Sequence, residues 1–186
     1  MTVFSCHSEE IGDRRRNLSK CFSYNKGNIF VYTVNIFVIM EKAEKYRLLE
    51  RQIASLLEGE TDTIAKMANV AAVLHETFGF WWTGFYRVAG EELVLGPFQG
   101  PVACMHIPYA KGVCGTAWAR RESVVVPDVE QFPGHIACSS ASRSEIVVPV
   151  FGPDGAVTAV LDIDSDRLAT FDEDDRVALE RIVRYL

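Results

Sequence analysis

Hydrophobic residues recur every three or four positions in two stretches that lie ahead of the middle of the chain. The first stretch covers residues 40–57, and its apolar residues fall on one face of a helix. The second runs to residue 78, has Thr61 or Asp62 as a possible N-cap, and is followed by Gly79, a residue type that often ends a helix. The pattern therefore predicts two amphipathic helices.

Beyond residue 79 the apolar spacing changes from helical to alternating. Aromatic and β-branched residues dominate the next segments, as is typical of strands. The predicted strands are 80–88, 92–98, 102–107, 124–126, 145–151 and 156–164. Residues 112–121 are expected to form a loop that leads into a short helix, and residues 128–143 a long loop. Thr170-x-x-Glu173 has the pattern of a capping box and predicts a closing helix that reaches Leu186.

The order of these elements favours an antiparallel sheet. Strands do not alternate with crossover helices, so we expect one α+β domain over residues 40–186, with a mostly antiparallel sheet covered by helices. Residues 1–39 differ from the rest, because a basic Arg14–Arg16 run precedes an apolar run at 29–39 that is too short to span a bilayer. We predict that translation naturally starts at Met40 and that residues 1–39 are a non-native or disordered extension.

Composition narrows the possible partners and the compartment. The chain is 48% hydrophobic and carries a net charge of -6, which argues against nucleic acid or an anionic membrane as the main partner. Two of the five cysteines, Cys6 and Cys21, lie in the extension. Three remain in a domain large enough to be stable without disulfides, so we expect reduced thiols and a cytoplasmic location.

The three remaining cysteines, Cys104, Cys114 and Cys138, lie among Gly, His, Ser and Lys residues rather than in an apolar run. Thiols in such surroundings can reach solvent and partners, so the choices are redox chemistry, a metal or a coincidence of loops. His106 and His135 could be imagined as further metal ligands, but the usual paired spacings of zinc sites do not occur, which argues against a metal. Three thiols separated by loops permit a redox relay: one attacks and becomes a sulfenic acid, a second condenses with it, and an external dithiol restores both.

Two strand segments carry side chains suited to a small polar ligand. Trp82 and Tyr86 share a strand face with a glycine between them, which predicts an open space for a small guest. Asp162 and Asp164 share a face of the last strand, and Glu145 begins the strand paired with it by a hairpin. Neighbouring carboxylates repel each other, so a cationic group is expected nearby. Core packing of the aromatic residues and a solvated acidic strand end are the alternatives.

Residues 42–186 resemble the free methionine-(R)-sulfoxide reductases, which are single-domain enzymes of the GAF superfamily. The resemblance rests on motifs that include W-x-G-F-Y at 82–86, L-G-P-F-Q-G at 95–100, A-K-G-V-C-G-T-A at 110–117, F-P-G-H-I-A-C at 132–138 and L-D-I-D-S at 161–165. The last motif is common among GAF domains, whereas three thiols in this setting are specific. The resemblance implies a GAF fold, with a ligand pocket under the loops between residues 104 and 138.

The resemblance also implies an activity. The family reduces the R epimer of free methionine sulfoxide without a bound cofactor, thioredoxin regenerates the enzyme, and NADPH supplies the electrons indirectly. Cys138 would attack the sulfoxide sulfur and Cys104 would resolve the sulfenic acid. Cys114 would pair with Cys138 or pass the disulfide onward, and Cys114 as the attacking thiol stays open.

The same resemblance implies roles for the pocket side chains. Glu145, Asp162 and Asp164 would hold the ammonium group and help to protonate the departing oxygen, while Trp82 and Tyr86 would cage the side chain. The wider superfamily suggests a homodimer. A GAF sensor module is the competing reading, but such a module would not require three thiols around its pocket.

Overall fold

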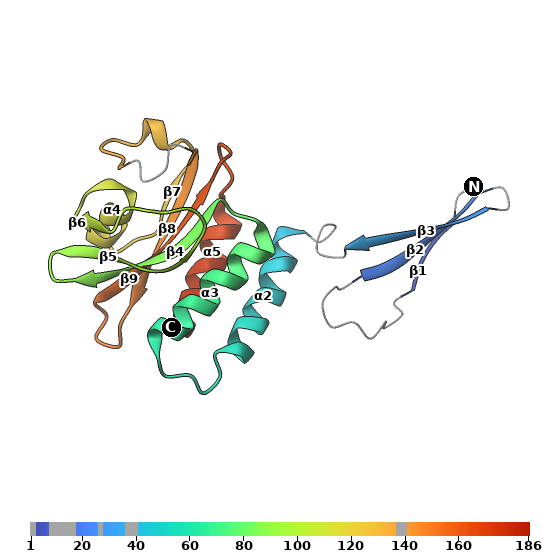
Figure 1. Cartoon of the computed structure of the whole chain (residues 1–186), viewed down its shortest axis with the longest axis horizontal. Coiled ribbons are helices and arrows are strands. Elements are labelled where there is room, and N and C mark those ends of the chain that lie inside the picture. Colours follow the sequence, from blue (N-terminus) through green and yellow to red (C-terminus); the bar gives the residue numbers. More distant parts are fainter. Residues whose placement is uncertain (1–2, 8–17, 26–27, 36–40, 137–140) are drawn as a thin grey trace. The chain divides into compact units, whose positions relative to one another are not determined.

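The computed structural model describes residues 3–7, 18–25, 28–35, 41–136 and 141–186. The chain divides into two units, Met1–Lys45 and Tyr46–Leu186. The first unit contains a three-stranded antiparallel sheet in the order β1–β2–β3, whose strands are β1 (Val3–His7), β2 (Leu18–Asn25) and β3 (Asn28–Asn35) (Figure 1). That translation starts at Met40 stays a prediction.

A six-stranded antiparallel sheet with the order β6–β5–β4–β9–β8–β7 forms the centre of the second unit. The strands are β4 (Trp82–Ala89), β5 (Glu92–Gln99), β6 (His106–Pro108), β7 (Val124–Val126), β8 (Ser144–Phe151) and β9 (Val157–Ser165). The helices are α2 (Lys42–Leu56), α3 (Thr63–Phe78), α4 (Gly112–Arg120) and α5 (Glu173–Ile182), with short 3₁₀ turns at Val129–Gln131 and Val183–Tyr185. The predicted α+β class is confirmed. Among the described residues, no helix is both long and apolar enough to cross a membrane.

Alternation along the central strands divides the buried side chains between two layers. Ile146, Leu161 and Ile163 pack with buried residues of α2, α3 and α5, whereas Val147 and Val160 pack with residues of α4. Figure 1 shows α4 on one side of the sheet and α2, α3 and α5 on the other. The motifs that suggest chemistry therefore share the α4 side with a smaller hydrophobic cluster, while the larger cluster supports the sheet from behind.

The ends of α3 follow the sequence prediction. Asp62 is the N-cap, and its Oδ1 accepts a hydrogen bond of 2.9 Å from the backbone N–H of Ala65. Gly79 ends the helix in the left-handed conformation, with φ of 67°. Residues next to the helix in the sequence thus define both of its ends.

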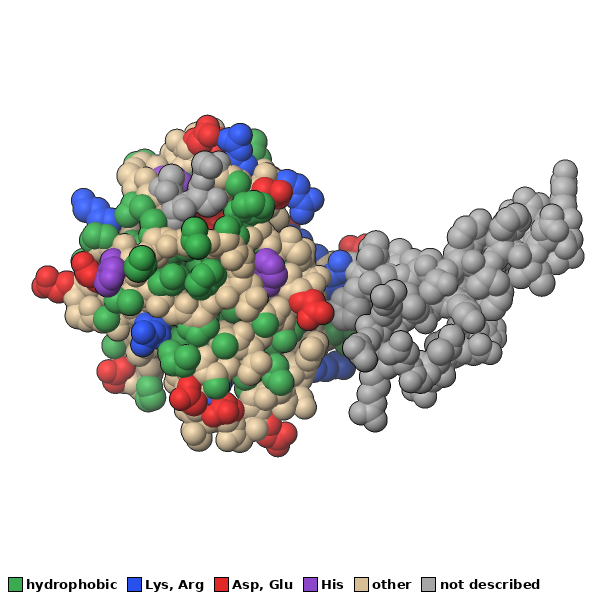
Figure 2. Space-filling view, viewed as in Figure 1, with side chains coloured by type: hydrophobic (Ala, Val, Ile, Leu, Met, Phe, Trp, Pro, Cys, Tyr) green, Lys and Arg blue, Asp and Glu red, His purple; other side chains and the backbone are tan. Residues whose placement is uncertain are grey.

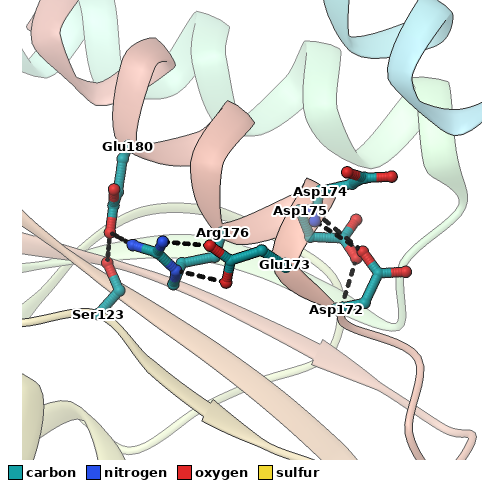
Figure 3. A network of polar contacts seen from close by, with 7 residues as sticks. All are labelled: Ser123, Asp172, Glu173, Asp174, Asp175, Arg176 and Glu180. Atoms are coloured by element: carbon teal, nitrogen blue, oxygen red, sulfur yellow. Dashed lines mark hydrogen bonds and ion pairs between the residues drawn. The ribbon is translucent and has the colours of Figure 1, made fainter.

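The predicted capping box of the last helix is wrong by two residues. The N-cap is Asp172, whose carboxylate accepts from the N–H of Asp175, while the Asp175 carboxylate accepts from the N–H of Asp172 at 2.8 Å (Figure 3). Thr170 does not cap because its hydroxyl donates to Ser165 Oγ at 2.8 Å, and Phe171 is buried in the core. The helix can begin only after these two residues are anchored.

Glu180 joins α5 to Ser123, the residue that precedes β7, and Arg176 of the same helix pairs with Glu180. Its guanidinium forms ion pairs with Glu173 and Glu180, and Ser123 Oγ donates to Glu180 Oε1 at 2.7 Å (Figure 3). Glu173 is largely exposed, so that pair contributes little to stability. We assign the network mainly an orienting role for α5.

The segment before β6 departs from the predicted strand over 102–107, because β6 covers only His106–Pro108. The indole Nε1 of Trp82 donates to the carbonyl oxygen of Pro101 at 3.1 Å, and the Tyr86 hydroxyl donates to that of Cys104 at 3.0 Å. These aromatic side chains hold the segment outside the strand ladder. The predicted strand over 102–107 is therefore wrong for the residues before His106.

Candidate active site

A pocket lies on the α4 side of the sheet and takes its lining from β4, α4, β8, β9 and the segments that connect them. Its polar lining consists of Cys114, His135, Ser142, Glu145, Asp162 and Asp164, and Trp82 and Tyr86 belong to its apolar lining. All five residues predicted to bind the ligand thus face one pocket, and Cys114 faces it with them. Their role in binding stays a prediction.

Strand register explains why residues far apart in sequence meet here. Strand β9 lies between β4 and β8, so that Asp164 is opposite both Trp82 and Glu145. Asp162 is opposite Gly84 on β4. Side chains directly opposite each other project from the same face of a sheet. The acidic and aromatic residues therefore share a face, as the alternation in the sequence predicts.

Burial raises the pKa values of the three carboxyl groups of the pocket. Glu145 and Asp162 are only 5% and 6% exposed. Burial, followed by repulsion from neighbouring carboxylates, raises the pKa of both groups well above the usual range. Burial also raises the pKa of Asp164 to about 6, against a hydrogen bond from Ser142 that lowers it. Burial and repulsion therefore hold the protons of Glu145 and Asp162 to higher pH than is usual, whereas Asp164, with a pKa of about 6, is mostly ionised at neutral pH.

One oxygen of the cluster lacks a partner. Asp162 Oδ1 is buried and has no hydrogen-bond partner among the described residues. Leaving a buried polar atom unsatisfied costs about 1–3 kcal/mol. A donor group on a bound ligand would remove this penalty, so the atom points to a site that is completed by its ligand.

Cys114 occupies the first turn of α4 and is 3% exposed. The expectation that it meets solvent is wrong, because its neighbours Val113 and Ala117 pack this turn against the sheet. Its Sγ lies 4.0 Å from Glu145 Oε1. Burial, and then the neighbouring carboxyl groups of Asp162 and Glu145, raise the pKa of Cys114, so it stays a thiol and is a weak nucleophile.

The other two pocket cysteines of the sequence prediction, Cys104 and Cys138, differ from Cys114. Cys104 is half-buried and disulfide-bonded, so the expectation of a reduced thiol is wrong for this residue. Cys138, the predicted nucleophile, lies outside the described residues. Of the described thiols, Cys114 is free and enclosed, whereas Cys104 lies in a segment whose neighbouring side chains are exposed.

The aromatic pair does not enclose the open space that its spacing predicts. The Trp82 ring stacks on Tyr86 and Phe98, with centroid separations of 5.9 and 5.4 Å. A Cβ atom added to Gly84 would lie 2.4 Å from both the Trp82 ring and Phe98 Cβ. The glycine therefore makes room for the indole ring, and a ligand has to meet the rings from elsewhere in the pocket.

Sequence reasoning missed two pocket residues. His135, considered in the sequence only as a metal ligand and set aside, has its Nε2 3.8 Å from Glu145 Oε2, and burial lowers its pKa so that the ring is neutral at pH 7. Ser142 donates to Asp164 Oδ1. The spacing of His135 from Cys138 gave a weak signal, whereas nothing singled out Ser142, because its contact joins a loop to a strand that comes much later.

Comparison with known proteins identifies the family. A model of the GAF domain matches residues 59–186, which include every residue of the pocket. The free methionine-R-sulfoxide reductase of Escherichia coli is 45% identical over 148 residues, which cover 79% of this chain and 89% of the relative. The chain belongs to the GAF-domain family of free methionine-R-sulfoxide reductases. The predicted family and GAF fold are thereby confirmed, and the family is one of oxidoreductases.

Two further relatives agree with this membership. GAF domain-containing protein A of Dictyostelium discoideum is 55% identical, over 78% of this chain and 92% of the relative. A solved structure of the Neisseria meningitidis free methionine-R-sulfoxide reductase, in complex with its substrate, is 54% identical with a TM-score of 0.77. That match covers 78% of this chain and 88% of the Neisseria chain, so the reductase domain is similar over nearly its whole length.

Proposed function

We propose that this reductase converts free L-methionine (R)-S-oxide to L-methionine and is regenerated by thioredoxin. The observation that carries the proposal is the buried carboxyl cluster beside Trp82, which includes an oxygen without a partner. A free amino acid brings an ammonium group, which is the cation that such a cluster requires. A methionine sulfoxide inside a peptide chain has no such group, so the cluster favours the free substrate.

The protonation of the cluster suits both ends of this substrate. Asp164 is ionised at pH 7 and, with Asp162 Oδ1, accepts hydrogen bonds from the ammonium group. The raised pKa of Glu145 suits it to donate a proton to the sulfoxide oxygen as the S–O bond breaks. Trp82 and Tyr86 contact the thioether portion.

The thiols carry the oxidation away in two steps. The Cys138 thiolate attacks the sulfoxide sulfur, the oxygen leaves on Cys138 as a sulfenic acid, and methionine is released. The Cys104 thiol then condenses with the sulfenic acid, which forms a disulfide and releases water. In support, Cys104 is disulfide-bonded, while Cys114 is buried with a raised pKa and remains a free thiol. Two thiols of thioredoxin reduce the disulfide, so one methionine sulfoxide consumes one dithiol.

The surroundings of Cys104 support access by a protein reductant. Val102 and Met105, on either side of it, are 86% and 71% exposed. Figure 2 shows hydrophobic side chains gathered on the viewed face, where β5, β6 and α4 lie in Figure 1. A dithiol protein has to bring its sulfur into contact with the disulfide, and exposed apolar side chains offer it a docking surface. A thioredoxin system of this kind fits a cytoplasmic location.

The cysteine assignment predicts a specific pattern of loss. In an assay that couples thioredoxin and thioredoxin reductase to NADPH oxidation, Cys138→Ser and Cys104→Ser abolish turnover of the free R epimer, and Cys114→Ser retains most of it. Loss of turnover in Cys114→Ser alone would show that the nucleophile is misassigned. A GAF sensor module would bind the ligand yet oxidise no NADPH, so a flat trace with active thioredoxin rejects the enzymatic proposal itself.

A further inference from the structure

Three donor atoms of different kinds converge at the floor of the pocket. The Sγ of Cys114 and one carboxyl oxygen each from Glu145 and Asp162 all lie within 4.8 Å of one another, and all three residues are buried. They come from α4, β8 and β9, so the sequence contains no local spacing that would indicate them. Asp162 supplies an independent sign of a missing ligand, because its Oδ1 has no hydrogen-bond partner among the described residues.

We propose that this cluster binds Zn²⁺, with Cys114, Glu145 and Asp162 as its ligands, and that the bound ion blocks the substrate pocket. Zinc is here a competing ligand and not a cofactor of the reaction. The site itself stands on the geometry alone. Its competition with methionine sulfoxide rests on the proposed function.

The distances need only a small contraction to suit zinc. A tetrahedral ion with Zn–S of about 2.3 Å and Zn–O of about 2.0 Å holds its sulfur and oxygen ligands about 3.5 Å apart. Cys114 Sγ and Glu145 Oε1 are 4.0 Å apart. Side-chain rotation can close a difference of this size, and three protein ligands leave a fourth position for water, as in many open zinc sites.

Charge favours a divalent cation at this place. No Lys or Arg among the described residues lines the pocket, whereas Asp164 adds a further carboxyl group beside the three ligands. Binding of Zn²⁺ displaces the thiol proton of Cys114 and the carboxyl protons of its partners, and those protons pass to solvent. The thiolate selects zinc over Mg²⁺ and Ca²⁺, which prefer oxygen ligands and higher coordination numbers.

The site also persists in the oxidised protein. Cys104 is disulfide-bonded while Cys114 remains free, so the three ligands stay available in that state. Zinc would therefore hold the enzyme inactive whichever redox state Cys104 is in.

The test uses the full chain with Cys6, Cys21, Cys104 and Cys138 replaced by Ser, so that Cys114 is the sole thiol. Zn²⁺ affinity is measured by competition with a chromophoric chelator, and Co²⁺ loading is followed by the thiolate-to-metal charge-transfer absorption. Circular dichroism verifies the fold of each variant. His106→Ala is the matched control, because His106 and Glu92 form an exposed pair that could hold metal weakly at the surface.

We expect one Zn²⁺ per chain, a charge-transfer band with Co²⁺, and an affinity at least about tenfold lower in both Cys114→Ser and Glu145→Gln. His106→Ala should bind as tightly as its parent. Equal affinity in the parent and in both ligand variants would overturn the site. If zinc binds at Cys114 but free methionine sulfoxide does not displace it, the metal site stands and the proposed substrate pocket is wrong.

Discussion

At the scale of single residues, the proton content of the pocket depends on side chains that never appear in a sequence motif. Glu145 and Asp162 hold their protons because they are buried beside each other, and Asp164 loses its proton more easily because Ser142 donates a hydrogen bond to it. The Ser142 hydroxyl thus lowers the pKa of Asp164, while the pKa values of its two neighbours stay raised by burial. The division of labour between binding the ammonium group and donating a proton rests on that separation.

Replacing Ser142 with Ala tests this separation. The lost hydrogen bond, worth about 1.5–3 kcal/mol for a charged acceptor, raises the pKa of Asp164 by about 1–2 units above its value of about 6. The acid limb of the kcat/KM profile should move to higher pH by the same amount. Ser144→Ala is the control, since that hydroxyl donates to the Arg167 carbonyl and not to the cluster. An acid limb that stays in place in Ser142→Ala would refute the role of the hydroxyl.

Stability should decrease with rising pH because of the same cluster. Folding raises the pKa of these carboxyl groups, so between about pH 4 and their folded values the native protein binds more protons than the unfolded chain. For Asp164, the rise from 3.8 to about 6 corresponds to about 3 kcal/mol at most. Urea unfolding at pH 5 and pH 8 measures how much the free energy of unfolding decreases between the two values. The decrease should be smaller in Asp162→Asn than in the parent, whereas Asp166→Asn, at an exposed position, should show the same decrease as the parent. A loss of equal size in all three proteins contradicts the burial argument.

At the scale of elements, β4 carries out two tasks. Its pairing with β9 places Trp82 and Tyr86 beside the carboxyl groups. The Trp82 indole N–H and the Tyr86 hydroxyl also donate hydrogen bonds to the carbonyl oxygens of Pro101 and Cys104. The second task keeps the segment that contains Cys104 close to the pocket. The strand therefore organises both the pocket and the position of Cys104, the proposed resolving thiol.

Tyr86→Phe removes the hydrogen bond from the Tyr86 hydroxyl to the carbonyl oxygen of Cys104 and keeps the aromatic ring. We expect methionine to form at a normal rate in the first turnover, whereas formation of the disulfide slows and kcat with thioredoxin falls. Rapid-quench measurement of methionine and thiol content separates the two steps. Tyr46→Phe is the control, because that hydroxyl donates to Asp175 on α5 and should affect stability alone. If both steps are unchanged in Tyr86→Phe, the hydrogen bond does not position Cys104.

Sequence patterns were sufficient for elements whose signals are local. The Asp62 cap, the Gly79 stop and the alternation on β4 and β9 depend on neighbours along the chain, and the structure confirms each of them. The predicted strand at 102–107 fails for the opposite reason, since side chains of β4 determine its path. The pairing of β8 with β9, which carry the three carboxyl groups, was predictable from the hairpin. The burial of Cys114 was not, because it depends on how α4 packs on the sheet.

At the scale of the whole domain, two layers divide support from chemistry. Figure 1 shows α2, α3 and α5 behind the sheet, where the larger hydrophobic cluster packs. The pocket takes its lining from the α4 side. The family and fold followed from the motifs, whereas the roles of His135 and Ser142 required the three-dimensional arrangement. The domain is thus a rigid sheet that presents a buried acidic site beneath a short helix and its flanking segments.

Reduced protein without thioredoxin provides the most direct measurement of the central claim, since it isolates the pocket from the regeneration step. It is mixed with the separate epimers of free methionine sulfoxide and with an N-acetylated R epimer, and methionine or its N-acetyl derivative is quantified after one turnover. The account predicts about one methionine per chain from the free R epimer, and no product from the S epimer or the N-acetylated compound, which lacks the ammonium group. Equal reduction of the N-acetylated compound would contradict the role of the acidic cluster, and no methionine from the free R epimer would contradict the function.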